Sequence, residues 1–65
     1  MTEADRRRYV SLLRFKSRAE IETELKIVKV QIAQRVSTEL PGDLYFKRLA
    51  LEESLYYLDP NNFQN

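Results

Sequence analysis

Apolar side chains recur at helical spacing between Ser17 and Leu40. The positions that make up this pattern are separated by steps of four, three, four and four residues, and they are Ile21, Leu25, Val28, Ile32 and Val36. Such spacing places them on one face of an α-helix. We therefore predict a helix over residues 18–39, which at ~1.5 Å per residue is roughly 33 Å long.

Part of the same stretch also fits a β-strand. Between Lys26 and Val36 β-branched residues are dense, and Val28, Val30 and Ile32 alternate with polar residues. We favour the helix, because its apolar face begins earlier in the chain and because no second strand-like segment is present to pair with this one. An isolated strand is unstable.

The first residues predict a shorter helix over residues 3–15. Thr2 or Asp5 can accept hydrogen bonds from the free N–H groups at its start. Its apolar face holds Tyr9, Leu12 and Leu13, with Val10 at the edge. Phe15 falls off this face, and we expect it either to pack against the next element or to form an exposed contact residue.

The junction of the first two helices is short. Ser17-Arg18-Ala19-Glu20 fits a capping box, in which the Ser17 oxygen accepts from the Glu20 N–H and Glu20 accepts from the Ser17 N–H. Because little chain is left for a loop, the two helices either meet at a sharp bend or continue with a kink at Ser17. The sequence leaves both arrangements open.

The segment Leu40-Pro41-Gly42-Asp43 predicts a turn over residues 40–43. Proline stops a helix, and glycine permits a left-handed turn. Asp43 is a suitable N-cap for a third helix over residues 44–58, where it can also pair with Lys47. A connection this short makes consecutive helices antiparallel neighbours. Residues 59–65 are expected to be a frayed tail.

The third helix is apolar nearly all round. Its leucines form one stripe, Leu44, Leu51, Leu55 and Leu58, and further apolar stripes contain Tyr45, Leu49 and Tyr56, and Phe46, Ala50 and Tyr57. A helix of this kind is normally buried on more than one side. One partner helix cannot cover three stripes, so we expect a second partner.

These patterns predict an all-α fold in a single small domain, residues 1–65. A short N-terminal helix precedes a long central helix and a C-terminal helix, and the last two form an antiparallel hairpin. We expect the hairpin to assemble into a homodimeric or higher helical bundle. The predicted interface residues are Ile27, Val30, Tyr45, Phe46, Leu49, Tyr56 and Tyr57. The alternative is that the N-terminal helix folds back and covers them within one chain.

The size and composition of the chain restrict the functions that it can have. A 65-residue chain has a small core, which is usually supported by disulfides, a metal or another chain. The sequence contains no Cys and no His, which leaves oligomerisation as the support. The usual catalytic nucleophile–base pairs are missing, and so short a chain can hardly enclose a substrate. We expect no enzyme activity, no cofactor, no metal site and no small-molecule substrate, and we read the acidic triplet Glu20, Glu22 and Glu24 as a solvated helix start.

Basic residues concentrate at the N-terminal end, although the net charge is only +1. The first 18 residues contain six of them against two acids, and these six are Arg6, Arg7, Arg8, Arg14, Lys16 and Arg18. Such a segment could bind the phosphate backbone of a nucleic acid. The alternative function is therefore that of a small nucleic-acid-binding regulator. The near-neutral balance of the whole chain argues against it.

The function that we expect is therefore protein–protein interaction. The chain would self-associate and act on another protein as an adaptor, inhibitor or assembly and regulatory factor. No apolar run approaches the ~18 residues of a membrane-spanning helix, so we expect a cytoplasmic protein without membrane contact.

Overall fold

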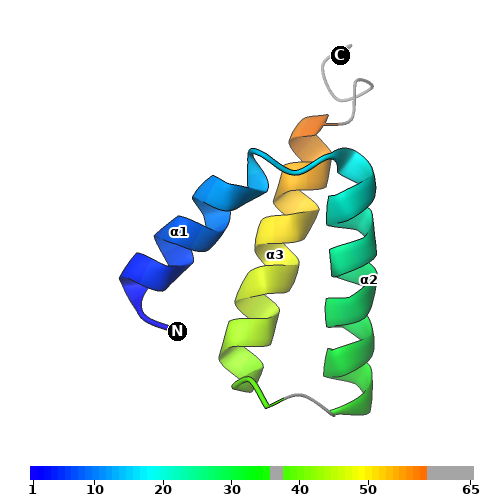
Figure 1. The fold of residues 1–65 in the computed structure, drawn as a ribbon. Helices are drawn as coiled ribbons and strands as arrows, with labels where there is room; N and C mark the ends of the chain where they lie inside the picture. Colours follow the sequence, from blue (N-terminus) through cyan, green and yellow to red (C-terminus); the bar gives the residue numbers. More distant parts are fainter. Residues whose placement is uncertain (36–37, 59–65) are drawn as a thin grey trace.

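The computed structural model of the chain describes residues 1–35 and 38–58, and within them the fold is all-α. Three helices follow one another, α1 (Glu3–Leu13), α2 (Arg18–Gln34) and α3 (Pro41–Leu58), as Figure 1 shows. The segment that also fitted a strand is helical as far as Gln34, so the strand alternative is wrong there. The predicted tail, residues 59–65, lies outside the described residues.

A capping box starts α1. The Asp5 N–H donates to Thr2 Oγ1, and the Thr2 N–H donates to Asp5 Oδ2, both at 3.2 Å. The bond that the carboxylate accepts from the Thr2 N–H, together with the Thr2 side chain, holds the pKa of the Asp5 carboxyl below its ordinary value, because hydrogen bonding favours the charged form. The helix ends at Leu13 rather than at residue 15. Beyond it, the N–H groups of Phe15 and Lys16 donate to carbonyls three residues back, so the last turn tightens before the chain leaves the helix axis.

The first two helices meet at a bend. Ser17 has an extended backbone, with φ −73° and ψ 162°, and its Oγ accepts from the Glu20 N–H at 3.2 Å. The return half of the predicted capping box is different, because the Glu20 carboxylate accepts from the Ser17 hydroxyl rather than from its N–H. The extended residue at Ser17 separates α1 from α2, which decides against a continuous helix.

The turn between α2 and α3 is longer than predicted, since α2 ends at Gln34 and not at residue 39. Arg35 follows with φ 54° and ψ 38°, and its N–H donates to the Gln31 carbonyl at 2.9 Å. A left-handed residue of this kind terminates a helix. Glycine is the usual residue at such a position, so an arginine there does not signal the end of a helix in advance. Val36, the last member of the predicted apolar face, lies outside the described residues.

The third helix begins at Pro41, three residues before its predicted start. Proline suits the first position of a helix, because that position needs no N–H donor and the fixed φ is helical. The Leu40 carbonyl accepts from the N–H groups of Asp43 and Leu44, at 3.0 and 3.2 Å. Gly42 does not have a positive φ, so Pro41 and Gly42 form the first turn of α3 rather than the predicted turn. Asp43 is accordingly not the N-cap.

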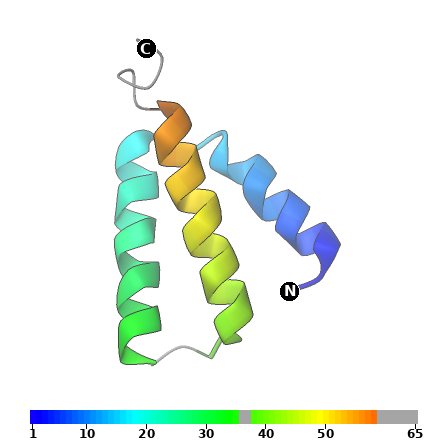
Figure 2. The same cartoon turned by 180° about the vertical axis from the view of Figure 1, so that it is seen from behind.

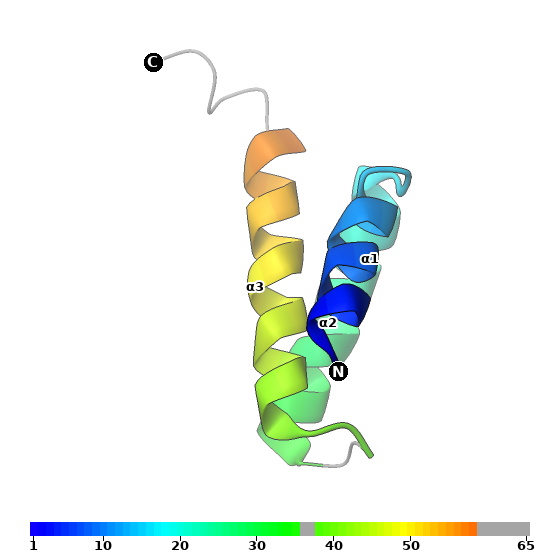
Figure 3. The same ribbon diagram turned by 90° about the vertical axis from the view of Figure 1, so that its left-hand side faces the viewer.

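The α2 and α3 helices run antiparallel and pack side by side, as predicted (Figures 1 and 2). In the same views α1 lies on the other side of α3, and its N-terminal end leans away from that helix. Figure 3 shows α3 standing to one side of the other two helices. The three helices therefore do not form a closed bundle, since the axis of α1 diverges from the hairpin towards its N-terminal end.

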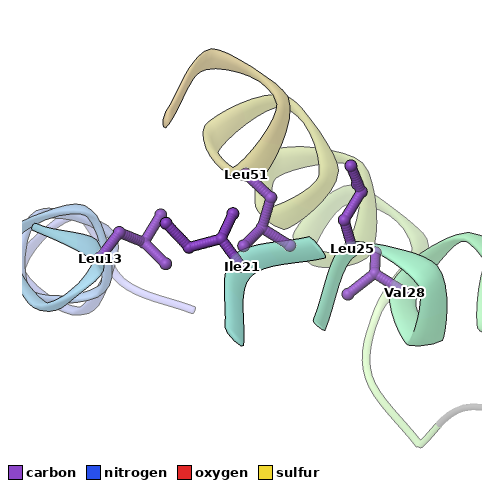
Figure 4. Close-up of a cluster of buried hydrophobic side chains, with 5 residues drawn as sticks. All are labelled: Leu13, Ile21, Leu25, Val28 and Leu51. Carbon is purple, nitrogen blue, oxygen red and sulfur yellow. The ribbon is translucent and has the colours of Figure 1, made fainter. Parts of the chain in front are cut away.

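The core forms where the three helices meet. Its buried cluster consists of Leu13, Ile21, Leu25, Val28 and Leu51, drawn in Figure 4. Ile32 and Leu55 are partly buried against this cluster, and Leu44 is buried nearer the turn. The apolar face predicted for the central helix is thus the face that α2 turns inward, as far as the described residues extend. Of the predicted leucine stripe, Leu58 is the exception, because it is 47% exposed.

Candidate protein-interaction surface

The described residues expose more large apolar side chains than they bury. Twelve are exposed, whereas six form the buried core. Isolated exposed apolar residues are normal, but contiguous ones mark contact sites.

Several of them gather in a groove between α1 and α3. The groove has a volume of about 610 Å³. Its apolar lining comes from both helices and consists of Val10, Leu13, Phe46, Leu49, Ala50, Tyr57 and Leu58. Arg14, Lys16, Glu53 and Ser54 supply the polar part of the lining. A second hollow, bordered by Glu3, Arg6, Arg7 and Ser11, shares Val10 and Phe46 with the first. The two hollows together follow most of α1.

The interface residues predicted from the sequence do not share one surface. Leu49 and Tyr57 line the groove and are 62% and 59% exposed. Phe46 also lines it, but its ring is partly covered within the chain, with the Tyr9 ring centroid 6.4 Å away and the Arg6 guanidinium 5.0 Å from its centre. The N-terminal helix therefore covers part of the predicted interface, as the alternative arrangement required, and leaves the rest open.

The other predicted interface residues lie outside the groove lining. On α3, Tyr45 has the Arg48 guanidinium 5.9 Å from its ring centre, and Tyr56 meets Tyr57 edge to face at 5.6 Å. On α2, Ile27 and Val30 remain 53% and 44% exposed. These two α2 residues, three positions apart, lie outside the groove lining and stay about half exposed.

Among the exposed apolar residues of the groove, sequence reasoning missed two, and it singled out neither Glu53 nor Ser54 of the polar lining. Val10 was placed at the edge of a buried face, yet it is 40% exposed, and Leu58 was assigned to the inner stripe of α3. Leu12, also expected to face inward, is 52% exposed. Only Leu13 of α1 is fully buried. Helical spacing showed which residues share a face, but not how closely that face approaches the hairpin. Phe15, at 85% exposed, is in the open and not packed on the next element.

A polar cluster fastens α1 to the hairpin. The Tyr9 hydroxyl donates to Glu24 Oε1 at 3.2 Å, and Lys16 Nζ donates to Glu24 Oε2 at 2.8 Å. Lys47 Nζ lies 5.6 Å from the centre of the Tyr9 ring and pairs with Glu39. Burial, together with the Glu24 carboxylate, raises the pKa of Tyr9 well above its ordinary value of 10.0. Lys47 was expected to pair with Asp43, so that prediction is wrong.

Asp43 instead contacts α1. Its Oδ2 accepts from the Met1 amino group at 3.1 Å, and its Oδ1 lies 3.9 Å from Arg6. Asp43 in the first turn of α3 and Glu24 on α2 thus contact opposite ends of the N-terminal segment. These contacts, with buried Leu13, set the position of α1 and therefore the shape of the groove.

The six basic residues of the N-terminal segment are divided among different contacts. Arg6 lies over Phe46, Arg7 pairs with Glu3 at 2.9 Å, Lys16 pairs with Glu24, and Arg18 pairs with Glu22 at 3.0 Å. In the described part of the chain, Arg8 and Arg14 form no ion pair within 4.0 Å. To contact one phosphate backbone together, the six basic side chains would have to lie on the same face of the protein. Four of them instead contact acidic or aromatic side chains of this chain.

Two further features bear on the surroundings of the site. The acidic triplet is divided, because Glu22 and Glu24 each pair with a basic side chain, and residues 1–35 and 38–58 bring together no three potential metal ligands. Within the same residues, every helix is too short or too polar to cross a membrane.

Comparison of the chain with models of protein families, with curated proteins and with solved structures finds no match.

Proposed function

We propose that this protein is a non-enzymatic interaction module that self-associates and acts on another protein as an adaptor, inhibitor or assembly factor. The observation that carries the proposal is the groove between α1 and α3. It is open, it is lined by apolar side chains of two helices, and two of its lining residues are more than half exposed. Such a surface is typical of a helix-binding contact site.

The energetics of so small a core support self-association. Six buried apolar side chains hold together three helices. Each apolar Å² removed from water contributes roughly 25 cal/mol, so covering Leu49 and Tyr57 would add to the few interactions that stabilise one chain. Aromatic side chains are also enriched in interfaces. A second copy that fills the groove would stabilise both chains.

The separate surface on α2 suits a different partner. Ile27 and Val30 face away from the core and take no part in the groove. A chain that pairs through the groove would therefore still present α2 to another protein. This division of surfaces fits an adaptor or assembly factor.

Light scattering over a range of concentrations tests the proposal. The mass should rise from the 7.8 kDa of one chain towards twice that value across the micromolar range. Leu49→Asp should keep the protein monomeric, because it places a charge in the groove. Ile27→Asp is the matched control, since it makes the same kind of change on α2 and should leave self-association unchanged. A single-chain mass at every concentration, with a cooperative melt, contradicts the proposal.

Nucleic-acid binding, the alternative function, is less well supported, because most cations of the N-terminal segment are engaged within the chain. A direct test is binding to duplex and single-stranded nucleic acid at two salt concentrations. Arg7→Ala and Arg8→Ala are the suitable changes, since Arg6 contacts Phe46 and Asp43 and its loss would disturb α1. Binding at low salt that these changes weaken, with a smaller salt slope, would favour the alternative.

A further inference from the structure

The polar residues of the groove show which kind of partner fits it. Lys16 already pairs with Glu24, and Ser54 is neutral. Two charges remain, Arg14 at the C-terminal end of α1 and Glu53 on α3. Within the described residues, neither of them has an ion-pair partner within 4.0 Å, although both line the same groove. The groove therefore presents one free cation and one free anion, on different helices.

Arg14 and Glu53 determine which kind of partner helix binds favourably in the groove. A purely apolar helix would cover Arg14 and Glu53 without pairing them, which costs free energy. A strongly acidic helix would pair with Arg14 and repel Glu53, and a strongly basic one would do the reverse. The best occupant carries one anion and one cation beside an apolar surface. The chain itself has this combination, and its net charge of +1 opposes the approach of a second copy only weakly.

We propose that the groove is occupied by a second copy of this chain in a twofold pair, in which Arg14 of each chain meets Glu53 of the other. The inference rests on the proposed self-association and adds its geometry. In a twofold interface, if one residue contacts another across the axis, the reciprocal contact follows by symmetry. Each pair of chains thus forms the Arg14–Glu53 contact twice. Leu49, one helical turn before Glu53, lies in the same contact.

Exchanging the two charges tests this geometry. Arg14→Glu and Glu53→Arg each replace two attractive contacts by two repulsive ones, and each should raise the dimer dissociation constant by roughly tenfold to a hundredfold. When the two variants are mixed, every contact between unlike chains is attractive again. The mixture should therefore form a heterodimer about as tight as the unchanged dimer, and the double variant should again form a homodimer.

Sedimentation equilibrium of each variant alone and of the mixture gives these constants. Arg8→Glu is the matched control, because it makes the same charge reversal on α1 outside the groove lining and should leave the constant within about threefold. Far-UV circular dichroism confirms that each variant is folded. Rescue in the mixture also excludes misfolding, because an unfolded chain would not pair.

The outcomes separate the two proposals. If the unchanged chain dimerises and the two single variants dimerise equally well, or if folded variants fail to pair when mixed, the twofold geometry is overturned and self-association stands. If the unchanged chain stays monomeric at every concentration, self-association itself is overturned. If each single variant dimerises weakly and the mixture of the two pairs tightly, both the self-association and its twofold geometry are supported.

Discussion

Replacing Leu51 by alanine removes a side chain at the point where all three helices meet. Leu51 is 0% exposed and packs in one cluster with Leu13 of α1 and Ile21 of α2 (Figure 4). The change deletes three carbon atoms, which at ~0.8 kcal/mol each is roughly 2.4 kcal/mol of transfer free energy. The cavity left behind raises the expected loss to about 3–5 kcal/mol. A chain of this length is stable by only ~3–10 kcal/mol.

The same helix supplies a matched control two residues away. Leu49 is 62% exposed, so Leu49→Ala makes an identical chemical change where no core is lost, and it should alter the free energy of unfolding by less than ~0.5 kcal/mol. Urea unfolding followed by far-UV circular dichroism measures both variants, at dilutions where stability does not depend on concentration. Equal losses for the two variants would refute the assignment of the inner and outer faces of α3.

Two further changes probe local structure. Gly42→Ala should stabilise the protein by roughly 0.5–1 kcal/mol, because Gly42 lies in the first turn of α3 without a positive φ and an added Cβ meets nothing within 4 Å; destabilisation in the same urea assay would indicate a left-handed turn instead. Tyr9→Phe should cost about 1 kcal/mol at neutral pH by removing the hydrogen bond to Glu24. Since folding raises the pKa of Tyr9, the contribution of the neutral phenol is complete below pH 10 and is lost as pH rises beyond it. The stability difference between the two proteins should therefore narrow by about pH 11, and a constant difference would contradict the role given to this hydroxyl.

The helices and the inner face of α2 could be predicted because they depend on local spacing. Ile21, Leu25 and Val28 are buried as their period requires. The turn could not be predicted in the same way. Pro41 fits both the end of one helix and the first position of the next, and the left-handed residue that ends α2 is an arginine, where the sequence pointed to the glycine seven residues later.

The candidate site depends on where α1 lies against the hairpin. The spacing of apolar residues does not predict that position. Phe46 and Leu49 are three residues apart on α3, yet one is partly covered by α1 and the other is exposed. The contacts that place α1 join residues distant in sequence, such as Tyr9 with Glu24 and Met1 with Asp43. Local patterns indicate which residues are apolar, whereas these long-range contacts decide which of them remain open.

Isotope-filtered nuclear Overhauser spectroscopy on a mixture of labelled and unlabelled chains shows directly whether a second copy of the chain occupies the groove. It detects only protons that approach each other across two copies. Occupation of the groove by a second copy predicts cross-peaks between chains from the Leu49 methyl groups and the Tyr57 ring, with none from Ile27 or Val30. A complete absence of cross-peaks between chains at high concentration, or cross-peaks confined to Ile27 and Val30, would show that no second copy occupies the groove.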